Sequence, residues 1–209
     1  MNAYKLNRVE SKLKVLHTDA KKDFARMSKG TVKSIFRPIQ PSDFKNVYLP
    51  ISKEQGNTLR QLIIDNNSKN VVEFGTSFGI STIYLADAVR QTGGQVVSTE
   101  LIESKAQKAI QNIEDADLSD FVEVRIGDAI ETLKDYSEPI DFLFLDGWKD
   151  LYLPLFKMLA PLFHENTLIY ADNMDMSDTK PYADYLIKNK GNYFSQIIDD
   201  GKAWLTRVV

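Results

Sequence analysis

Hydrophobic and polar residues alternate along this chain with two different periods. Between residues 70 and 171, short apolar runs rich in β-branched residues are separated by stretches whose apolar positions lie three or four residues apart. Near-continuous apolar runs are typical of strands buried on both faces, and the longer spacing is typical of helices packed on a sheet. The predicted strands are Asn70–Phe74, Gln95–Glu100, Phe121–Ile126, Ile140–Leu145 and Thr167–Ala171.

Helical patterns fill the intervals between these strands. Strict alternation of strand and helix predicts a doubly wound, Rossmann-like α/β fold with a mostly parallel sheet. After the last of these strands, two more strand-like runs, Tyr193–Ile198 and Ala203–Val208, flank an Asp-Gly turn, so the seven-stranded sheet is expected to end in an antiparallel hairpin. The predicted helices are Ile80–Gln91, Glu103–Asp115, Ala129–Tyr136, Asp150–Phe163 and one near Lys180–Lys190.

The first 50 residues have a different character. Ser52 followed by Gln55 resembles a capping box and opens a helix that reaches about Asn67, so the main domain is expected at 51–209. We predict that residues 1–50 form a helical arm and connector that act as a lid. The helix, expected over 4–28 and closed by Gly30, carries apolar residues at Leu6, Val9, Leu13, Leu16, Ala20, Phe24 and Met27.

Charge is divided unevenly between these two parts. The 209 residues carry a net charge of −3, but residues 1–40 hold ten Lys/Arg and three Asp/Glu, a net of +7. The remaining residues hold sixteen against twenty-six, a net of −10. An acidic body suits cationic ligands, and we expect the basic arm to cover the mouth of the acidic site rather than bind nucleic acid.

Composition excludes several chemistries. Without cysteine there is no disulfide, zinc–thiolate site or thiol nucleophile, and only two histidines, His17 and His164, are present. A metal would therefore be held mainly by oxygen, which favours magnesium, manganese or calcium. No apolar run is long enough to span a membrane, and the N-terminus lacks the apolar core of a signal peptide, so we expect a cytoplasmic protein with no membrane partner.

Acidic residues end three successive strands around a glycine turn. Gly75 and Gly79 are four apart, so the turn is neither the G-x-G-x-x-G of a dinucleotide fold nor a phosphate-binding Walker loop. Glu73 precedes the turn, Glu100 ends the second strand where an acid can bind a ribose diol, and Asp128 follows the third strand. Each acid alone is more often a cap or a solvated charge. Together they favour a cationic nucleoside without phosphate, such as S-adenosylmethionine.

Two segments resemble a known family. Residues 73–81 (EFGTSFGIS) resemble the first motif of class I S-adenosylmethionine-dependent O-methyltransferases. Residues 140–154 (IDFLFLDGWKDLYLP), with Ala171-Asp172-Asn173 beyond them, resemble catechol O-methyltransferase and, more loosely, the caffeoyl-CoA O-methyltransferase type. The likeness covers residues 50–175 well, the final hairpin weakly, and residues 1–45 not at all.

This resemblance implies a set of site residues. Asp146 and Lys149 would be catalytic, with Lys149 as general base. Asp146, Asp172 and Asn173 would ligate one magnesium ion. The cofactor would be held by Glu73, Gly75, Gly79, Ser81, Glu100, Asp128 and Trp148.

The residue types fit that chemistry independently. Two carboxylates and an amide at adjacent strand ends form an oxygen-only site for a divalent ion, which could bind acceptor hydroxyls and lower their pKa. Lys149, three residues after Asp146, lies on the same rim and could accept the hydroxyl proton. We therefore expect a metal-dependent O-methyltransferase acting on a small hydroxylated, catechol-like or phenolic acceptor.

The chain also departs from the family pattern. Gly147 stands where catechol O-methyltransferase has a histidine, and around Tyr193–Ser195 no acid matches the residue that binds catechol. Phe36, Phe44 and Tyr48 are candidates for the acceptor pocket wall. Two alternatives stay open: a methyltransferase acting on RNA or another macromolecule, and a cofactor-binding module without catalysis. The missing G-x-G-x-x-G argues against a nicotinamide oxidoreductase, and the pairing of two copies into a homodimer is also left open.

Overall fold

Seven strands form one sheet in the order β3-β2-β1-β4-β5-β7-β6. Strands β1 to β5 are parallel, and β7 runs antiparallel to both β5 and β6. The order reverses between β1 and β4, which places the ligand-binding crevice of a doubly wound sheet at their carboxyl ends. The predicted fold, including its antiparallel hairpin, is confirmed. The strands are β1 (Asn70–Phe74), β2 (Gln95–Glu100), β3 (Val122–Ile126), β4 (Ile140–Leu145), β5 (Phe163–Ala171), β6 (Tyr193–Ile198) and β7 (Ala203–Val208).

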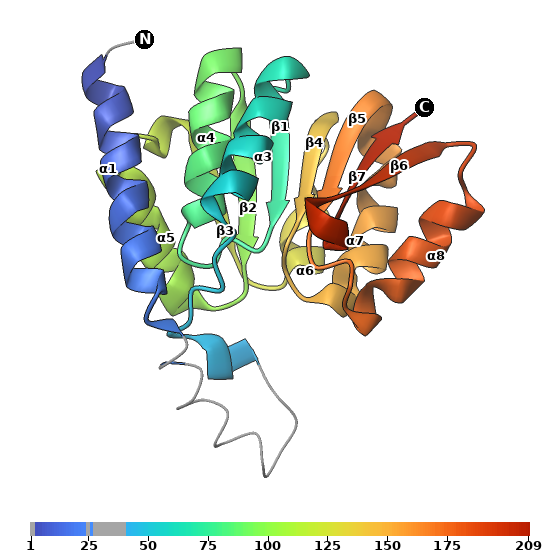
Figure 1. Cartoon of the computed structure of the whole chain (residues 1–209). Helices are drawn as coiled ribbons and strands as arrows, with labels where there is room; N and C mark the ends of the chain where they lie inside the picture. The colour runs from blue at the N-terminus through green and yellow to red at the C-terminus, as the bar shows by residue number, and fades with distance from the viewer. Residues whose placement is uncertain (1–2, 24–25, 27–40) are drawn as a thin grey trace.

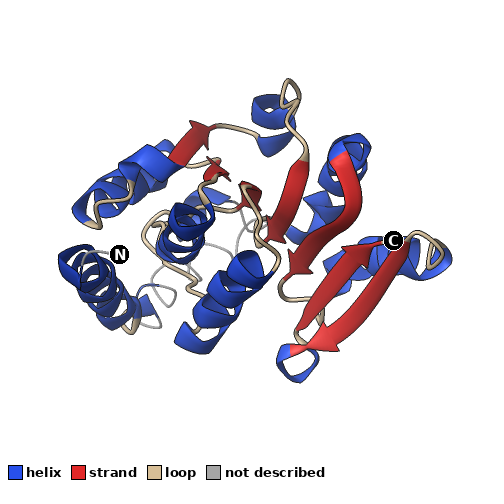
Figure 2. Ribbon diagram, turned by 90° about the horizontal axis from the view of Figure 1, so that it is seen from above, coloured by secondary structure: helices blue, strands red, loops and turns tan. Residues whose placement is uncertain are grey.

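Helices cover both faces of this sheet (Figures 1 and 2). The computed structural model describes residues 3–23, 26 and 41–209. One face carries α3 (Lys53–Asp65), α4 (Ile80–Thr92) and α5 (Glu103–Asp115), and the first helix, α1 (Ala3–Ala20), packs outside them against α4 and α5. The other face carries α6 (Ala129–Leu133), α7 (Tyr152–Leu159) and α8 (Lys180–Lys188).

The two cores follow from the alternation of side chains along each strand. Val71, Phe142 and Leu168 pack into the cluster under α3 and α4. Their neighbours Val72 and Leu143 belong to the second cluster, with α7 and α8. Because successive strand residues face opposite sides, a strand buried on both faces must be apolar at every position.

Two predicted helices differ from those observed. The helix expected over 4–28 is interrupted: α1 ends at Ala20, a turn follows at 21–22, and Asp23 and Arg26 are again helical, with the Asp23 side chain hydrogen-bonded to the connector. The predictions for Phe24, Met27, Gly30 and Phe36 concern positions outside the described residues. The helix expected over Ala129–Tyr136 ends at Leu133.

The predicted helix Asp150–Phe163 is also wrong in its bounds. It is split into a 3-10 turn at Lys149–Leu151, α7, and a second 3-10 turn at Ala160–Leu162 that contains Pro161. Strand β5 begins at Phe163, four residues before the predicted start, because its ladder with β4 shifts register between Ile140 and Phe142. The irregular first part of β5 contains exposed polar residues, so the sequence there lacks the apolar run that would have predicted the start of the strand.

The connector leads directly into the sheet. A 3-10 turn at Pro41–Phe44 is followed by the segment 47–51 and by α3, whose capping box is confirmed: Ser52 Oγ accepts from Gln55 N, and Gln55 Oε1 accepts from Ser52 N, both at 3.0 Å. Within the part of the chain that the structure describes, every helix is too short or too polar to cross a membrane.

Candidate active site

The turn after β1 lies against the turn after β4 because Gly75 has no side chain. Gly75 has a φ of +112°, and a Cβ there would stand 2.9 Å from the backbone carbonyl of Asp146. Asp146 N donates to Phe74 O over 2.9 Å, which joins the same two turns. This close approach brings the carboxyl ends of the two strands to one point, as the order reversal of the sheet requires.

A cavity of about 570 Å³ opens at this edge of the sheet. Its wall contains residues from the ends of all five parallel strands, β1 to β5, and from the connector before α3. Of the predicted site residues, Gly75, Glu100, Asp128, Asp146, Trp148, Lys149, Asp172 and Asn173 line it, whereas Glu73, Gly79 and Ser81 do not.

Glu73 is fully buried behind the glycine turn. Its carboxylate accepts hydrogen bonds from Ser81 Oγ (2.5 Å), Thr82 Oγ1 (2.6 Å) and Ser98 Oγ (2.5 Å). These donors lie on α4 and β2, so the carboxylate joins the start of α4 to two strands. Burial raises the pKa of Glu73 to about 7, against the lowering effect of the three hydroxyls.

Glu100 and Asp128 meet the cavity with carboxylates that also accept backbone hydrogen bonds. Glu100 Oε2 accepts from Ser77 N at 2.8 Å, and its Oε1 accepts from Ile102 N at 2.9 Å. Asp128 caps α6 by accepting from Ile130 N at 2.8 Å. Each acid therefore accepts backbone hydrogen bonds, as a capping residue does, and also lines the cavity.

Asp146 and Lys149 form a half-buried ion pair at the end of β4. Lys149 Nζ lies 3.1 Å from Asp146 Oδ1 and 2.9 Å from the hydroxyl of Tyr152. That hydroxyl donates to the carbonyl oxygens of Leu145 (2.8 Å) and Asp172 (3.1 Å), the residues at the ends of β4 and β5. Tyr152 thus holds the two strand ends together and orients the lysine, a role that the sequence did not reveal.

Asp172 and Asn173 follow β5 on the same wall. Asp172 is 6% exposed, and its Oδ1 accepts from Gln55 Nε2 over 3.2 Å. Asn173 adopts the left-handed conformation with a φ of 55°, which an asparagine tolerates better than most residues. Gln55 therefore takes part both in the cap of α3 and in a hydrogen bond to Asp172 on the cavity wall.

These two acids have properties that favour a bound cation. Burial raises the pKa of Asp146 to about 6, with Lys149 acting against the shift and the Asp172 charge adding to it. Burial likewise raises the pKa of Asp172. Among the described residues no group of three or more His, Cys, Asp and Glu side chains could hold a metal. The predicted set contains only two such residues and an amide, and a buried and a half-buried carboxylate, both partly unneutralised, beside an amide oxygen fit a hard divalent ion.

Aromatic and basic side chains complete the wall. The rings of Phe44 and Trp148 meet edge to face, with centroids 6.2 Å apart, and both line the cavity together with Tyr48. Lys105, from the first turn of α5, is 5% exposed and lies 5.4 Å from the centroid of the Phe78 ring. Sequence reasoning missed Lys105, because a lysine in the first turn of an amphipathic helix reads as a solvated residue.

The departure at Gly147 has a steric cause. Gly147 lines the cavity, and a Cβ at this position would stand 2.5 Å from atoms of the Phe74 ring. The cavity wall there is bare backbone backed by an aromatic ring, and a side chain could enter only if Phe74 moved. Tyr193 and Ser195 lie on edge strand β6 and do not line the cavity.

Comparisons with known proteins agree with this geometry. The model of a methyltransferase domain family matches residues 72–174, which include the glycine turn and both acidic strand ends. Catechol O-methyltransferase from Niastella koreensis is 33% identical over 144 residues, covering 64% of this chain and 65% of that protein. Caffeoyl-CoA O-methyltransferase 2 from Petunia hybrida is 30% identical over 128 residues, covering 58% and 52%. The chain thus spans less than two thirds of the length of these curated relatives.

A solved structure extends the likeness to most of the fold. The O-methyltransferase from Bacillus cereus, in complex with SAH, is 26% identical, with a TM-score of 0.68 and coverage of 88% of this chain and 90% of that one. Its cofactor-derived ligand agrees with a nucleoside site in this fold. In sequence and in fold, the chain is therefore similar to class I S-adenosylmethionine-dependent O-methyltransferases, with a methyltransferase domain match over residues 72–174.

Proposed function

We propose that this protein is a divalent-metal-dependent O-methyltransferase that transfers the methyl group of S-adenosylmethionine to a small hydroxylated, catechol-like or phenolic acceptor. The observation that carries the proposal is that Asp146, Lys149 and Asp172 line one cavity with Glu100 and Asp128. A nucleoside site and an acidic site with a lysine beside it are what methyl transfer to a hydroxyl requires in one place.

In this proposal the cofactor lies over the glycine turn. Glu100 takes the ribose diol and Asp128 the adenine, while the backbone at Gly75 leaves room for the methionine part. Glu73 and Ser81 act from behind the turn: their hydrogen bond fixes the start of α4, and with it Gly79 and the shape of the loop. Trp148 closes the nucleoside end as part of the wall.

The acidic wall would position and activate the acceptor. Asp146, Asp172 and Asn173 would hold a magnesium, manganese or calcium ion, which when bound lowers the pKa of an acceptor hydroxyl. Lys149 would accept the hydroxyl proton, held at its place by Asp146 and the Tyr152 hydroxyl. The acceptor oxygen then attacks the sulfonium methyl in line, the carbon–sulfur bond breaks, and its electron pair leaves on a neutral thioether. Orientation of both reactants supplies much of the acceleration.

Aromatic side chains favour a flat acceptor. Phe44 and Trp148 offer an edge-to-face pair beside the acidic wall, and Leu49 and Met176 extend the apolar surface. An aromatic ring could lie against this surface with its hydroxyl directed to Lys149. The replacement of the family histidine by Gly147 leaves this wall wider on one side.

The test is transfer of labelled methyl from S-adenosylmethionine to a panel of catechols, phenols and flavonoids, with magnesium or with a chelator. We expect transfer that chelation abolishes and added metal restores. Transfer that persists under chelation would refute the metal mechanism. Tight cofactor binding without transfer to any acceptor would favour a non-catalytic module, and salt-sensitive binding and methylation of RNA would favour a macromolecular substrate.

A further inference from the structure

Part of the cavity wall comes from the connector rather than from the sheet. Tyr48, Leu49 and Pro50 line the cavity, and the segment ends at Ile51, before the cap of α3. Leu49 has a φ of 47°, in the left-handed region, and its side chain is half exposed. A leucine in this conformation is strained by about 1 kcal/mol or more, so other contacts must hold the backbone there.

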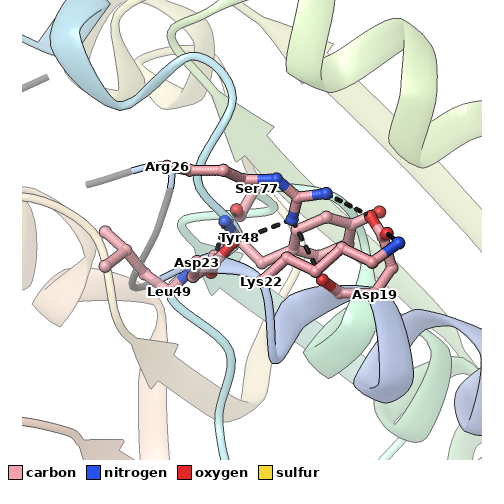
Figure 3. Close-up of polar contacts among 7 residues, drawn as sticks. All are labelled: Asp19, Lys22, Asp23, Arg26, Tyr48, Leu49 and Ser77. Carbon is pink, nitrogen blue, oxygen red and sulfur yellow. Dashed lines mark hydrogen bonds and ion pairs between the residues drawn. The ribbon is translucent and has the colours of Figure 1, made fainter. Parts of the chain in front are cut away.

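Asp23, beyond the end of α1, supplies those contacts (Figure 3). Its Oδ2 accepts hydrogen bonds from the backbone N–H groups of Tyr48, at 2.8 Å, and Leu49, at 3.0 Å. Asp23 is 7% exposed and does not line the cavity. One carboxylate oxygen therefore fixes two consecutive peptide groups of the wall without touching the space inside it.

Arg26 neutralises and orients this carboxylate. Its Nη1 lies 2.9 Å from Asp23 Oδ1, its Nη2 lies 2.6 Å from Asp19 Oδ2, and its guanidinium carbon is 5.2 Å from the centroid of the Tyr48 ring. Lys22, in contrast, pairs with Asp19 alone among the described residues, at 2.9 Å, and its side chain is 69% exposed. The arm thus contributes a paired, half-buried cluster in which Asp23 and Arg26 face the wall.

Tyr48 carries the contact onward to the glycine turn. Its ring stacks on that of Phe78 with centroids 4.2 Å apart, and its carbonyl accepts from Ser77 Oγ over 2.8 Å. Ser77 N donates in turn to Glu100 Oε2. A continuous set of contacts therefore runs from Asp23 through the wall to Glu100, the acid expected to bind the ribose.

We infer that Asp23 and Arg26 are a positioning pair: they hold the Tyr48–Leu49 wall against the glycine turn and so preform the nucleoside end of the cavity before any ligand enters. The nature of the ligand rests on the proposed function, but the contact itself does not.

The first test compares Asp23→Ala with the wild type in binding of S-adenosylhomocysteine by calorimetry. Without its two acceptor bonds the wall is unfixed, and the ligand must order it on binding, so we expect affinity about 10- to 100-fold weaker. In turnover the KM for the cofactor should rise in step, while kcat at saturation changes less than about threefold, because the pair touches no reacting group.

Matched variants separate positioning from general damage. Lys22→Gln removes the neighbouring cation of the same cluster and should bind as the wild type does. Asp23→Asn keeps an oxygen that can accept from both N–H groups but loses the charge facing Arg26, so it should fall between wild type and Asp23→Ala. Arg26→Gln should weaken binding in the same direction, and it serves if Asp23→Ala fails to fold.

A readout without ligand makes the inference independent of the proposed function. By NMR hydrogen exchange, the Tyr48 and Leu49 amides should exchange at least tenfold faster in Asp23→Ala, while those of Phe142 and Leu143 in β4 keep wild-type rates. Unchanged exchange at Tyr48 and Leu49 would overturn the contact. Fast exchange with wild-type affinity would overturn its role in forming the cavity. Failure of the wild type to bind the ligand would overturn the proposed function and leave the exchange test in force.

Discussion

Glu73, fully buried, and Asp146, half-buried, are carboxylates at the ends of neighbouring parallel strands, yet their surroundings differ. Glu73 accepts from three hydroxyls that belong to α4 and β2, and it lies behind the cavity wall. Among the described residues the Asp146 side chain hydrogen-bonds only to Lys149, and it lies on the wall itself, with Asp172 close enough to raise its pKa. One carboxylate is surrounded by fixed neutral donors, and the other faces a lysine and an open space.

The same sequence pattern, an acid at the end of an apolar strand, therefore corresponds to two different roles in the structure. An acid at the end of an apolar strand can hold the fold or present a charge to a ligand, and the neighbours decide which. Where hydroxyls from adjacent elements converge, removal of the acid leaves buried donors unsatisfied and costs stability. Where the partners are few and the carboxylate faces a cavity, its charge is available to a ligand.

The largest expected effect is on turnover at Asp146. Asp146→Ala should lower kcat/KM by about 10³-fold or more, because it removes a proposed metal ligand and the partner of Lys149. Affinity for S-adenosylhomocysteine should stay within about threefold of wild type, measured by calorimetry. Asp141→Asn is the matched control at the other end of β4, where Asp141 Oδ2 accepts from Lys69 N and Asn70 N, and it should keep its turnover. Loss of cofactor binding in Asp146→Ala would show that the site is misplaced.

Lys149 should come next. Lys149→Met should reduce kcat by about 10²- to 10⁴-fold in single-turnover measurements, the range of a general base. Lys149→Arg can keep the charge contact with Asp146, yet an arginine stays protonated and cannot accept the hydroxyl proton, so its turnover should remain low. Near-normal turnover in the arginine variant would mean that the residue works by charge alone.

At Glu73 we expect the main effect on the stability of the fold rather than on turnover. Glu73→Ala should lower the free energy of unfolding by about 2–4 kcal/mol, because three hydroxyls lose their acceptor and a buried void forms. Glu73→Gln, which keeps the shape and can still pair with hydroxyls, should lose much less at pH 5. Urea unfolding of the three proteins measures this order, and equal stability of Glu73→Ala and wild type would break the comparison.

The pH dependence follows from the raised pKa of Glu73. The folded-state pKa is about 7 and the reference value is 4.5. Between these values the native state keeps a proton that the unfolded state has lost, so stability is greatest below the lower value and falls as pH rises toward 7. The decrease is about 3 kcal/mol at most and should be absent in Glu73→Gln. A wild type whose stability relative to Glu73→Gln is constant from pH 4.5 to 7.5 would show that the three hydroxyls keep the carboxylate charged.

The smallest effect is expected at Lys105, which shares the cavity wall with Asp146. Burial lowers the pKa of Lys105 more than the charges of Glu100, Asp23 and Asp146 raise it, and Lys105 has no direct ion pair among the described residues, so Lys105→Met should raise the free energy of unfolding by about 1 kcal/mol. The same change should weaken binding of S-adenosylhomocysteine if the ammonium faces the ligand. Thermal unfolding with and without that ligand measures both the stability of the variant and its ligand binding. A destabilised variant would indicate that the cation–π contact with Phe78 outweighs the cost of burying the ammonium group.

The sequence alone determined the fold class and most of the strands, because strands buried on both faces must be apolar at every position. It also located the acids that end β1, β2, β4 and β5, since each follows directly after such a run. It could not place the start of β5, because a register shift there puts exposed polar residues inside the strand. The end of α1 could not be predicted either. The apolar spacing continues beyond Ala20 and gives no sign that the Asp23 side chain accepts a hydrogen bond from the backbone of Tyr48.

Only the tertiary structure decided which acids reach the cavity. Glu73 and Asp146 look alike along the chain, but the hydroxyls of Ser81, Thr82 and Ser98 reach one of them and not the other. The contacts of Asp23 with Tyr48 and Leu49 span 25 and 26 residues, and those of Gln55 with Asp172 span 117. Such contacts leave no periodic signal, because they depend on where folding brings separate segments together rather than on the spacing of residues within one.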